Sequence, residues 1–464
     1  MPEAIRWRGI HLDLKGSPLP IEVLLEEVRQ MAAWGVNLLL IEYEDSFPYA
    51  FDRGIQAATA YSPADIGRIV ASCKSLNVEV MPLVQTFGHL EFVLKHERYS
   101  WMAQTSGSIV SVDPTLPESG GLILRMIDEV LAAHPDSRWL HLGGDEVWDL
   151  GEGERSKARA QQIGKDGLYL EHMMPIIEHV LARGVRPVLW DDMMRHWPMQ
   201  SLQALVPKAD LMSWSYGANP FERIRREPLA NFQDAGMHLW AGAAFKGADG
   251  VTADLPNDRV RMSNMETWAK YVVENNWEGM VATGWSRYSG TTTYCELWQA
   301  APMSLYLAAE VMRKGYYEPG DWDKACLETL GVDHLPVDWA AGRFPRKALD
   351  TAVGSAHGTR RLAELRAIAS VAQWRRDAHA ALADRWQAFG FFEDPGRYNE
   401  WSVQKSRRAA QDVAAAWPAI RQQFEQVMQP VLCPQDIADY LASRERMGMQ
   451  YLQPVLGWKG TGDR

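Results

Sequence analysis

Short apolar runs alternate with longer amphipathic stretches along the first two thirds of the chain. Eight runs rich in β-branched residues stand at residues 5–13, 36–43, 78–84, 139–143, 186–191, 211–216, 237–243 and 279–285. Helical periodicity lies between them, most clearly at 21–34, 63–76, 121–134, 168–183 and 262–275. Buried strands that alternate with helices predict parallel strands joined by helical crossovers. Eight such units within about 300 residues predict a (β/α)8 (TIM) barrel.

Polar side chains gather just after the carboxyl end of several apolar runs. Asp13 ends the first run, His89 follows the third, Asp145 and Glu146 follow the fourth, and Lys246 follows the seventh. Because the site of a (β/α)8 barrel lies at the carboxyl ends of its strands, we expect these residues to share one face of the molecule.

The strand periodicity stops after residue 320. Long amphipathic segments at 360–389, 402–428 and 434–451 predict helices. We therefore expect a catalytic barrel over residues 1–320 and an α-helical region over residues 321–464. The helical region has no clustered acids or glycine-rich loops, so we assign it no chemistry and regard it as a candidate interface of a homodimer.

The fourth run ends in two glycines followed by two adjacent acids. Strand alternation points His141 into the barrel and its leucine neighbours toward the helices. Asp145 and Glu146 diverge in a regular strand, so they address one pocket only if the chain bends at Gly143 and Gly144. Two carboxylates in a partly dry pocket raise the pKa of at least one of them, as a general acid requires.

Two other interpretations of these acids stay open at this point. An Asp-Glu pair after a strand is also typical of a solvated turn, and carboxylates at a barrel mouth also bind divalent cations. Few histidines accompany the pair, and no HxH or HxxxD spacing is present. We therefore expect neither a metal ion nor a cofactor.

Composition narrows the class of ligand. The formal net charge of −11 argues against a nucleic-acid or anionic-membrane surface, and no apolar run approaches the ~18 residues of a membrane span. The four cysteines have no paired spacing and the chain does not begin like a signal peptide, so we expect a reduced cytoplasmic protein. Most of the 20 tryptophans must fill the core, but their flat rings also stack on the apolar faces of sugars, which favours a carbohydrate ligand.

The segment His-Leu-Gly-Gly-Asp-Glu-Val at 141–147 closely resembles the active-site signature of the family-20 β-N-acetylhexosaminidases. Three other segments match the family in the same order: Arg8-Gly9 on the first strand, Glu44-Asp45 after the second, and Phe87-Gly88-His89 after the third. The resemblance covers the barrel. The positions at which this chain departs from the family pattern are similar to those of the hexosaminidase D-like subgroup.

The resemblance implies an exo-acting, retaining hydrolase of terminal β-linked N-acetylgalactosamine or N-acetylglucosamine. Such enzymes use the 2-acetamido oxygen of the substrate to attack the anomeric carbon and form an oxazolinium ion, so no protein nucleophile is needed. Carried onto this chain, Glu146 is the general acid/base and Asp145 orients the acetamido group. His89 supports the acid, and Glu44, Asp45 and His141 are further supporting residues.

Besides His89, six residues are expected to contact the sugar. The resemblance implies that Arg8 binds its hydroxyls and that Trp190, Trp214 and Trp285 surround the acetamido group. The seventh strand has Ala-Ala-Phe-Lys at 243–246 in place of a Trp-Tyr pair, so Tyr216 becomes the candidate donor to the acetamido oxygen. The eighth strand has Trp-Ser-Arg-Tyr at 285–288 in place of Trp-Gly-Glu, which makes Arg287 a candidate contact where a glutamate is common.

Two rival hypotheses use the same residues. One is a sugar-binding barrel without turnover, which the adjacent Asp145 and Glu146 disfavour because a binding protein needs no general acid. The other is an ordinary retaining glycosidase, in which Glu146 acts with Asp191 or Asp192 as a protein nucleophile.

Overall fold

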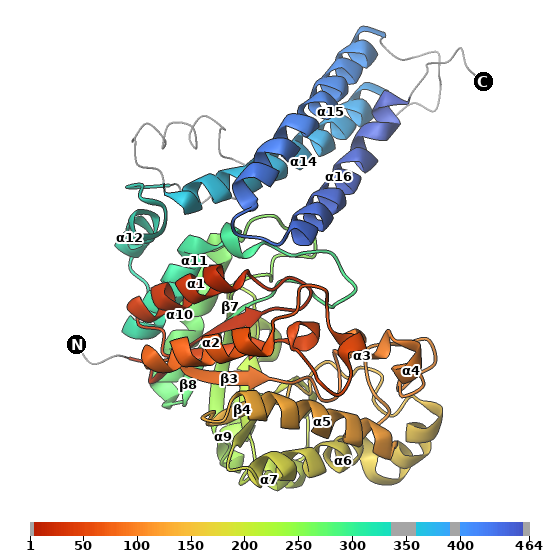
Figure 1. Cartoon of the computed structure of the whole chain (residues 1–464), viewed down its shortest axis with the longest axis vertical. Helices are drawn as coiled ribbons and strands as arrows, with labels where there is room; N and C mark the ends of the chain where they lie inside the picture. Colours follow the sequence, from red (N-terminus) through yellow and green to blue (C-terminus); the bar gives the residue numbers. More distant parts are fainter. Residues whose placement is uncertain (1–3, 336–358, 390–399, 458–464) are drawn as a thin grey trace.

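Eight parallel strands form a closed barrel in the computed structural model, which describes residues 4–335, 359–389 and 400–457. The strands are β1 (Trp7–Asp13), β2 (Leu38–Glu42), β3 (Glu79–Leu83), β4 (Trp139–His141), β5 (Arg186–Trp190), β6 (Asp210–Trp214), β7 (Leu239–Lys246) and β8 (Gly279–Gly284). They pair in chain order, and β1 closes the barrel against β8 (Figure 1). The (β/α)8 barrel expected from the sequence is confirmed.

Helices follow the strands where the amphipathic stretches predict them. Five coincide with predicted helices: α1 (Ile21–Ala33), α2 (Pro63–Ser75), α5 (Pro117–Ala133), α6 (Glu154–Leu181) and α10 (Asp258–Asn275). Helix α6 begins earlier than predicted because two helices run together across a kink at Gly164, whose φ is 78°. The others are α3 (Glu91–Leu94), α4 (Glu97–Ser100), α7 (Met199–Leu205), α8 (Phe221–Ile224), α9 (Glu227–Ala235), α11 (Pro302–Lys314) and α12 (Pro319–Leu330), with 3-10 turns η1 (Glu44–Ser46), η2 (Arg53–Ile55), η3 (Asp192–Met194) and η4 (Trp298–Ala300).

Strand alternation separates two apolar cores. Leu140 and Leu142 belong to the core between the strands and the helices, whereas Trp139 belongs to the barrel interior. His141 is buried against the interior ring of Trp190, with ring centroids 4.3 Å apart. The predicted orientation of His141 and its leucine neighbours is therefore confirmed.

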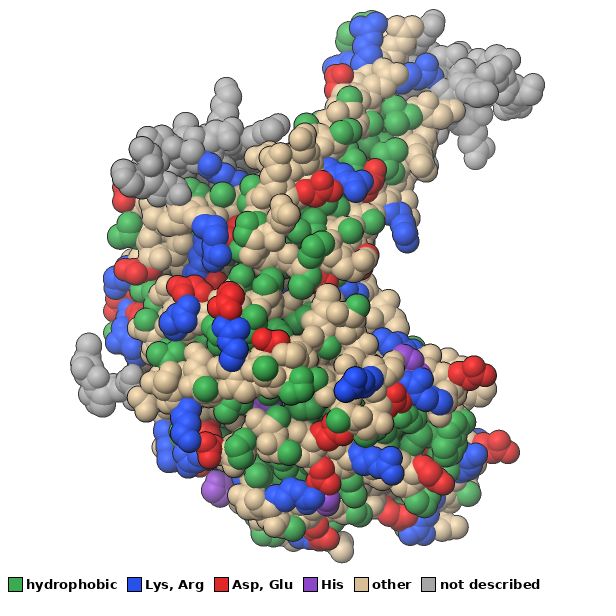
Figure 2. Space-filling model, viewed as in Figure 1, with side chains coloured by type: hydrophobic (Ala, Val, Ile, Leu, Met, Phe, Trp, Pro, Cys, Tyr) green, Lys and Arg blue, Asp and Glu red, His purple; other side chains and the backbone are tan. Residues whose placement is uncertain are grey.

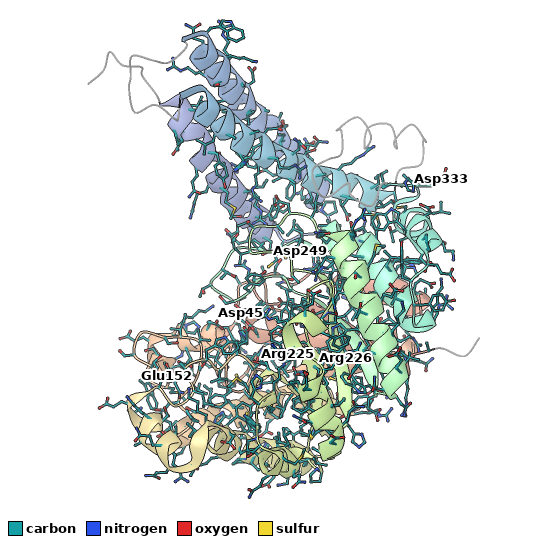
Figure 3. The ribbon with its side chains drawn as sticks, turned by 180° about the vertical axis from the view of Figure 1, so that it is seen from behind. Asp45, Glu152, Arg225, Arg226, Asp249 and Asp333 are labelled. Carbon is teal, nitrogen blue, oxygen red and sulfur yellow. The ribbon has the colours of Figure 1, made fainter. Side chains whose placement is uncertain are left out.

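Three long helices form a bundle beside the barrel (Figure 1). They are α14 (Arg360–Phe389), α15 (Glu400–Met428) and α16 (Pro434–Leu456), as the sequence predicts. Figure 3 shows the molecule from behind, with Asp249 of the β7–α10 loop near the base of the bundle. The division of the chain at residue 320 stays a prediction.

Two features of the surface bear on ligands. Figure 2 shows positive and negative side chains interspersed on one face of the molecule. Within the described part of the chain, no helix has both the length and the apolar character needed to cross a bilayer.

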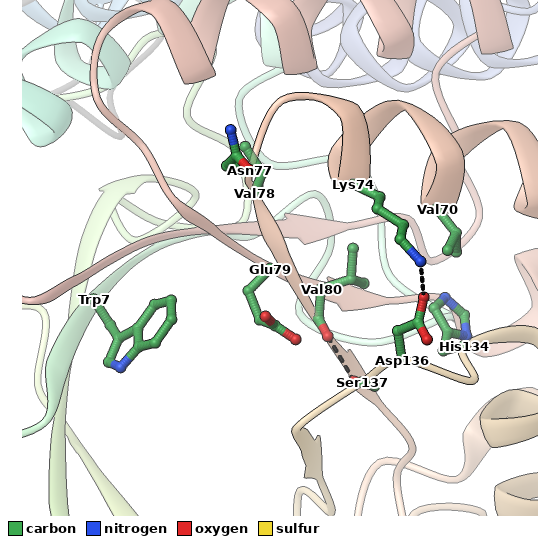
Figure 4. Close-up of a pocket in the computed structure, with 10 residues that line it drawn as sticks. All are labelled: Trp7, Val70, Lys74, Asn77, Val78, Glu79, Val80, His134, Asp136 and Ser137. Carbon is green, nitrogen blue, oxygen red and sulfur yellow. Dashed lines mark hydrogen bonds and ion pairs between the residues drawn. The ribbon is translucent and has the colours of Figure 1, made fainter.

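A cavity of about 350 Å³ opens at the amino-terminal end of the barrel (Figure 4). Its lining includes Glu79, the first residue of β3, together with Trp7, His134 and Asp136. The side chain of Asp136 pairs with Lys74 at 2.6 Å. Because barrel enzymes carry their chemistry at the opposite face, we assign this cavity no part in catalysis.

Candidate active site

The chain bends sharply where β4 ends. Gly143 and Gly144 have φ values of 60° and 80°, in the left-handed region that glycine adopts without steric cost. A Cβ atom at Gly143 would collide with the side chain of Gln85, and one at Gly144 would collide with the hydroxyl of Tyr169. The bend predicted from the two glycines is present.

One imidazole joins the two acids that follow the bend. His89 Nε2 lies 3.4 Å from Asp145 Oδ2 and 3.4 Å from Glu146 Oε2. Burial alone would lower the pKa of His89, but the Asp145 charge and the hydrogen bonds to both carboxylates raise it well above its ordinary value. His89 and Glu146 have positive φ values of 55° and 51°, which residues other than glycine adopt rarely. Strained backbone at two strand ends therefore presents this three-residue group.

The pKa of Glu146 is lowered, which is opposite to the expectation for a general acid. The hydrogen bond from His89 is the largest cause, and the positive charges of His89 and Arg223 act in the same direction against the effect of burial. The sequence predicted that His89 supports the acid, but it did not predict that this imidazole lowers the pKa of Glu146.

Asp192 supports Glu146 from the end of β5. Asp192 Oδ2 accepts the backbone N–H of Glu146 at 3.0 Å, and Oδ1 accepts the indole N–H of Trp214 at 3.3 Å. Burial, followed by the charge of Asp145, raises the pKa of Asp192 to about 7. A raised carboxyl pKa is thus present at the site, at Asp192 and not at Glu146.

Asp191 is held in a separate ion pair. It is fully buried, and its carboxylate accepts hydrogen bonds from the Arg195 guanidinium at 2.6 and 3.1 Å. Both oxygens of Asp191 and both oxygens of Asp192 are therefore engaged, which disfavours either aspartate as a nucleophile.

Four aromatic side chains expected around a sugar lie together at the barrel mouth. The ring centroids of Trp190 and Trp285 are 6.3 Å apart, those of Tyr216 and Trp285 6.3 Å, and those of Trp214 and Tyr216 5.1 Å. Nε1 of Trp190, Nε1 of Trp285 and Oδ1 of Asp145 are buried without a hydrogen-bond partner among the described residues. Buried polar atoms without partners are rare, so two donors and one acceptor are available to a ligand.

A buried lysine network at the mouth was missed in the sequence. Lys15 Nζ lies 3.1 Å from Asp13, 3.4 Å from Glu42 and 3.9 Å from Glu44, and 4.7 Å from the Trp285 ring centroid. Burial alone would lower the pKa of Lys15, but the three carboxylates raise it well above its ordinary value. The available signal was a lysine two residues beyond the strand-end Asp13.

The two acids expected after β2 lie beside this network. Glu44 has a φ of 46°, and burial raises its pKa well above the ordinary value despite the nearby Lys15. Asp45, labelled in Figure 3, accepts the backbone N–H of Gly16 at 3.2 Å and pairs with Lys95 at 3.6 Å. Both acids thus hold the loops after β1 and β2.

His141 is a neutral structural residue at the base of the site. Burial lowers its pKa to about 3. Its Nδ1 accepts the backbone N–H of Gly143 at 3.1 Å, which helps to fix the bend.

The expected sugar contact of Arg8 is wrong. Arg8 is the second residue of β1, and its guanidinium donates to the carbonyls of Gly35 and Ile5 at 2.7 and 2.8 Å, at the amino-terminal end of the barrel. Five residues of extended chain, about 16 Å, separate it from Asp13 at the mouth. Lys15 is the cation that lies at the correct end.

Arg287 braces loops at the mouth, and its expected contact with the sugar stays a prediction. Its guanidinium donates to the carbonyls of Thr292 and Gly16 at 3.0 and 3.2 Å and lies 4.0 Å from the ring centroid of Tyr294. The guanidinium thus connects the loop after β8 with the loop after β1.

Comparison with known proteins identifies the family. The profile described as glycosyl hydrolase family 20, catalytic domain, matches residues 5–227. Hexosaminidase D of Homo sapiens is 34% identical over 473 residues, which cover 97% of this chain and 94% of that protein. The chain belongs to glycosyl hydrolase family 20. Hexosaminidase D of Bos taurus is 38% identical over 340 residues, covering 71% of this chain and 98% of the relative.

A solved structure of the same family shares the fold. The chitobiase of Flavobacterium johnsoniae aligns with a TM-score of 0.55 at 15% identity, covering 99% of this chain and 73% of that chain. The recognition of this chain as a hexosaminidase D-like glycoside hydrolase of family 20, a β-N-acetylhexosaminidase, is therefore confirmed.

Proposed function

We propose that the protein is an exo-acting, retaining β-N-acetylhexosaminidase that removes terminal β-linked N-acetylgalactosamine or N-acetylglucosamine with help from the acetamido group of the substrate. The observation that carries this proposal is the bridge of His89 between Asp145 and Glu146. Asp145 has an oxygen without a partner among the described residues, which is available to the acetamido group. Glu146 shares a proton with the imidazole of His89.

In the first step Glu146 gives a proton to the glycosidic oxygen while the acetamido oxygen attacks the anomeric carbon. The bond to the leaving group breaks, and an oxazolinium ion forms on the substrate. Asp145 Oδ1, which is buried without a partner, accepts the acetamido N–H and stabilises its developing positive charge. The indole N–H groups of Trp190 and Trp285 are further donors beside the sugar.

In the second step Glu146 accepts a proton from water, and the hydroxide attacks the anomeric carbon. The oxazolinium ring opens, and two inversions give overall retention. His89 is the proton reservoir, because its raised pKa keeps it protonated between the carboxylates. A bound sugar excludes water from Glu146, and desolvation favours the protonated form of a carboxyl group.

The alternatives have less support. A binding protein without turnover gives no reason for a strained, histidine-linked pair of acids. A protein nucleophile requires a free carboxylate, whereas Asp191 is engaged with Arg195, and Asp192 with Glu146 and Trp214.

Location and assembly are the last part of the proposal. We propose a cytoplasmic protein, because all four cysteines are free and three of them are buried. A glycan with a terminal N-acetylhexosamine is its proposed partner, and the helical bundle is the proposed surface of a homodimer.

The direct experiment compares wild type with Glu146→Gln on aryl β-N-acetylgalactosaminide and aryl β-N-acetylglucosaminide. We expect wild-type turnover of at least one substrate and a loss of about 10²–10⁴-fold in the variant, the range for a general acid. Glu171→Gln, a change at a surface glutamate that pairs with Arg159, is the matched control. Wild-type inactivity on both substrates, or full activity of Glu146→Gln, would contradict the proposal.

A further inference from the structure

Trp148 stands directly beyond the proposed acid and is largely exposed. It follows Glu146 by two residues, and 67% of its surface is accessible to solvent. Its backbone N–H donates to the carbonyl oxygen of Glu146 at 2.9 Å, so the indole branches from the turn that carries the acid. A single exposed tryptophan does not by itself indicate a binding site, but Trp148 lies two residues beyond the proposed proton donor.

The turn that carries Trp148 is held firmly on both sides. Val147 and Leu150 are buried in the core between the strands and the helices. The side-chain amide of Gln104 donates to the carbonyl oxygen of Asp149 at 2.7 Å, and the hydroxyl of Thr105 donates to Asp149 Oδ2 at 3.1 Å. The neighbours of Trp148 are thus tied to the core and to the segment between β3 and β4, while the indole faces solvent.

The reaction places the leaving group on the outer side of Glu146. The acid protonates the oxygen that joins the terminal sugar to the rest of the substrate, so the next ring must lie beyond the acid. Trp190 and Trp214, the rings expected around the terminal sugar, are buried, whereas Trp148 is exposed. The buried tryptophans therefore suit the terminal sugar of a glycan, and Trp148 suits the sugar next to it.

We propose that Trp148 is a stacking platform for the leaving-group saccharide, in a subsite outside the catalytic pocket. This inference rests on the proposed function. An indole offers a flat apolar face and one N–H donor, which match the apolar face and the hydroxyls of a neutral sugar ring. The ligand class is thus a β-linked oligosaccharide whose second residue covers Trp148.

The experiment uses two substrates that share the terminal sugar and differ in the leaving group. One is the β-fluoride of the hexosamine that wild type prefers, since fluoride is too small to reach Trp148. The other is the β-linked disaccharide of the same hexosamine with galactose. The ratio of kcat/KM for the disaccharide to kcat/KM for the fluoride isolates the contribution of the second ring.

Three variants complete the test. Trp148→Ala is expected to lower this ratio about tenfold, the scale of a lost aromatic contact. Trp148→Phe, which keeps a flat ring, is expected to retain most of the ratio. Trp401→Ala is the control, because Trp401 is 69% exposed on α15, and it is expected to leave the ratio unchanged.

The outcomes separate this inference from the proposed function. Active wild type with a ratio that is unchanged in Trp148→Ala overturns the platform and leaves the proposed function standing. An equal loss in Trp148→Ala and Trp401→Ala also overturns it. Wild type that is inactive on both substrates overturns the proposed function and the platform together.

Discussion

The imidazole of His89 lies 3.4 Å from the carboxylate of Glu146, and this contact determines the charge of the proposed acid. It lowers the pKa of Glu146, while the two carboxylates raise the pKa of His89. The proton therefore rests on the imidazole at pH values where an ordinary histidine, with a pKa of about 6.5, has already lost it.

His89→Gln is expected to move the basic limb of the kcat/KM profile to lower pH by about one unit or more, because Glu146 alone must then hold the proton. The measurement is kcat/KM on an aryl β-N-acetylhexosaminide from about pH 4 to 9. His179→Gln, a change at a histidine that contacts Asp128 on the outside of the barrel, is the control. A basic limb that does not move in His89→Gln would show that the shared proton is not the catalytic one.

Asp192 is expected to make stability depend on pH. Burial raises its pKa from 3.8 to about 7, so between these values the folded protein keeps a proton that the unfolded chain has released. Stability from this group therefore falls as pH rises through that window. The free energy of unfolding of wild type minus that of Asp192→Asn should be largest near pH 4 and shrink by about pH 8 in urea titrations. A constant difference would contradict the raised pKa.

Lys15→Met is expected to destabilise the fold by about 3–5 kcal/mol near neutral pH, because it leaves buried carboxylates without their cation. Burial alone would raise the pKa of Glu42, but Lys15 and His11 hold it well below the ordinary value. Glu42 therefore contributes to the free energy of unfolding at pH values above the ordinary carboxyl pKa, and this contribution is lost as pH falls. The loss of unfolding free energy in Lys15→Met should therefore become smaller below about pH 5.

Chemical denaturation of two further variants checks this prediction. Lys15→Met combined with Glu42→Gln should recover part of the stability, since the buried carboxylate that Lys15 keeps charged is also removed. Lys74→Met removes a surface pair with Asp136 and should change little. Equal losses in Lys15→Met and Lys74→Met would refute the importance of the buried network.

Arg444 connects the helical bundle to the loops that follow β7 and β8. Its Nε lies 2.7 Å from Asp254 Oδ1, and its Nη2 donates to the carbonyl of Tyr294 at 2.9 Å. The loop of Tyr294 is tied to Trp285 through Lys246, whose Nζ donates to the carbonyls of Trp285 and Glu296 at 2.6 and 3.0 Å.

Arg444→Met is expected to cost about 3 kcal/mol of stability, because the buried Asp254 loses one of its two cations among the described residues and keeps Arg375, at 2.6 Å. It should also raise KM more than it lowers kcat, since the loop behind Trp285 loosens while Glu146 is untouched. Denaturant titrations and steady-state kinetics measure the two effects. A KM that rises no more than kcat falls would contradict a positioning role.

The fold could be predicted from the sequence because its signals are local. Each strand is one apolar run, and five helices of the barrel coincide with amphipathic stretches between the runs, so the eight units are visible without long-range information. The bend at Gly143 and Gly144 was predictable for the same reason. Even the inward position of His141 follows from alternation within a single strand.

The site was only partly predictable because its electrostatics combine distant strands. His89 from β3 lowers the pKa of Glu146 after β4, and Asp192 after β5 holds the Glu146 backbone. The Phe-Gly-His segment predicted that His89 supports the acid, but not the direction of the pKa shift, and the contact of Asp192 has no signal in the spacing of residues. Arg8 matched a motif, but the match gave its place in the chain and not the end of the barrel at which its side chain binds. Lys15 was missed because a single lysine becomes informative only when three acids surround it.

The role of the substrate as nucleophile is tested most directly by replacing the hydrogens of its acetamido methyl group with fluorine. Fluorine withdraws electron density from the attacking oxygen, so kcat/KM for aryl β-hexosaminides should fall steadily from acetamido to difluoroacetamido to trifluoroacetamido, by about 10²-fold or more in total. A rate that changes by less than about twofold across this series would contradict substrate assistance and indicate a nucleophile on the protein.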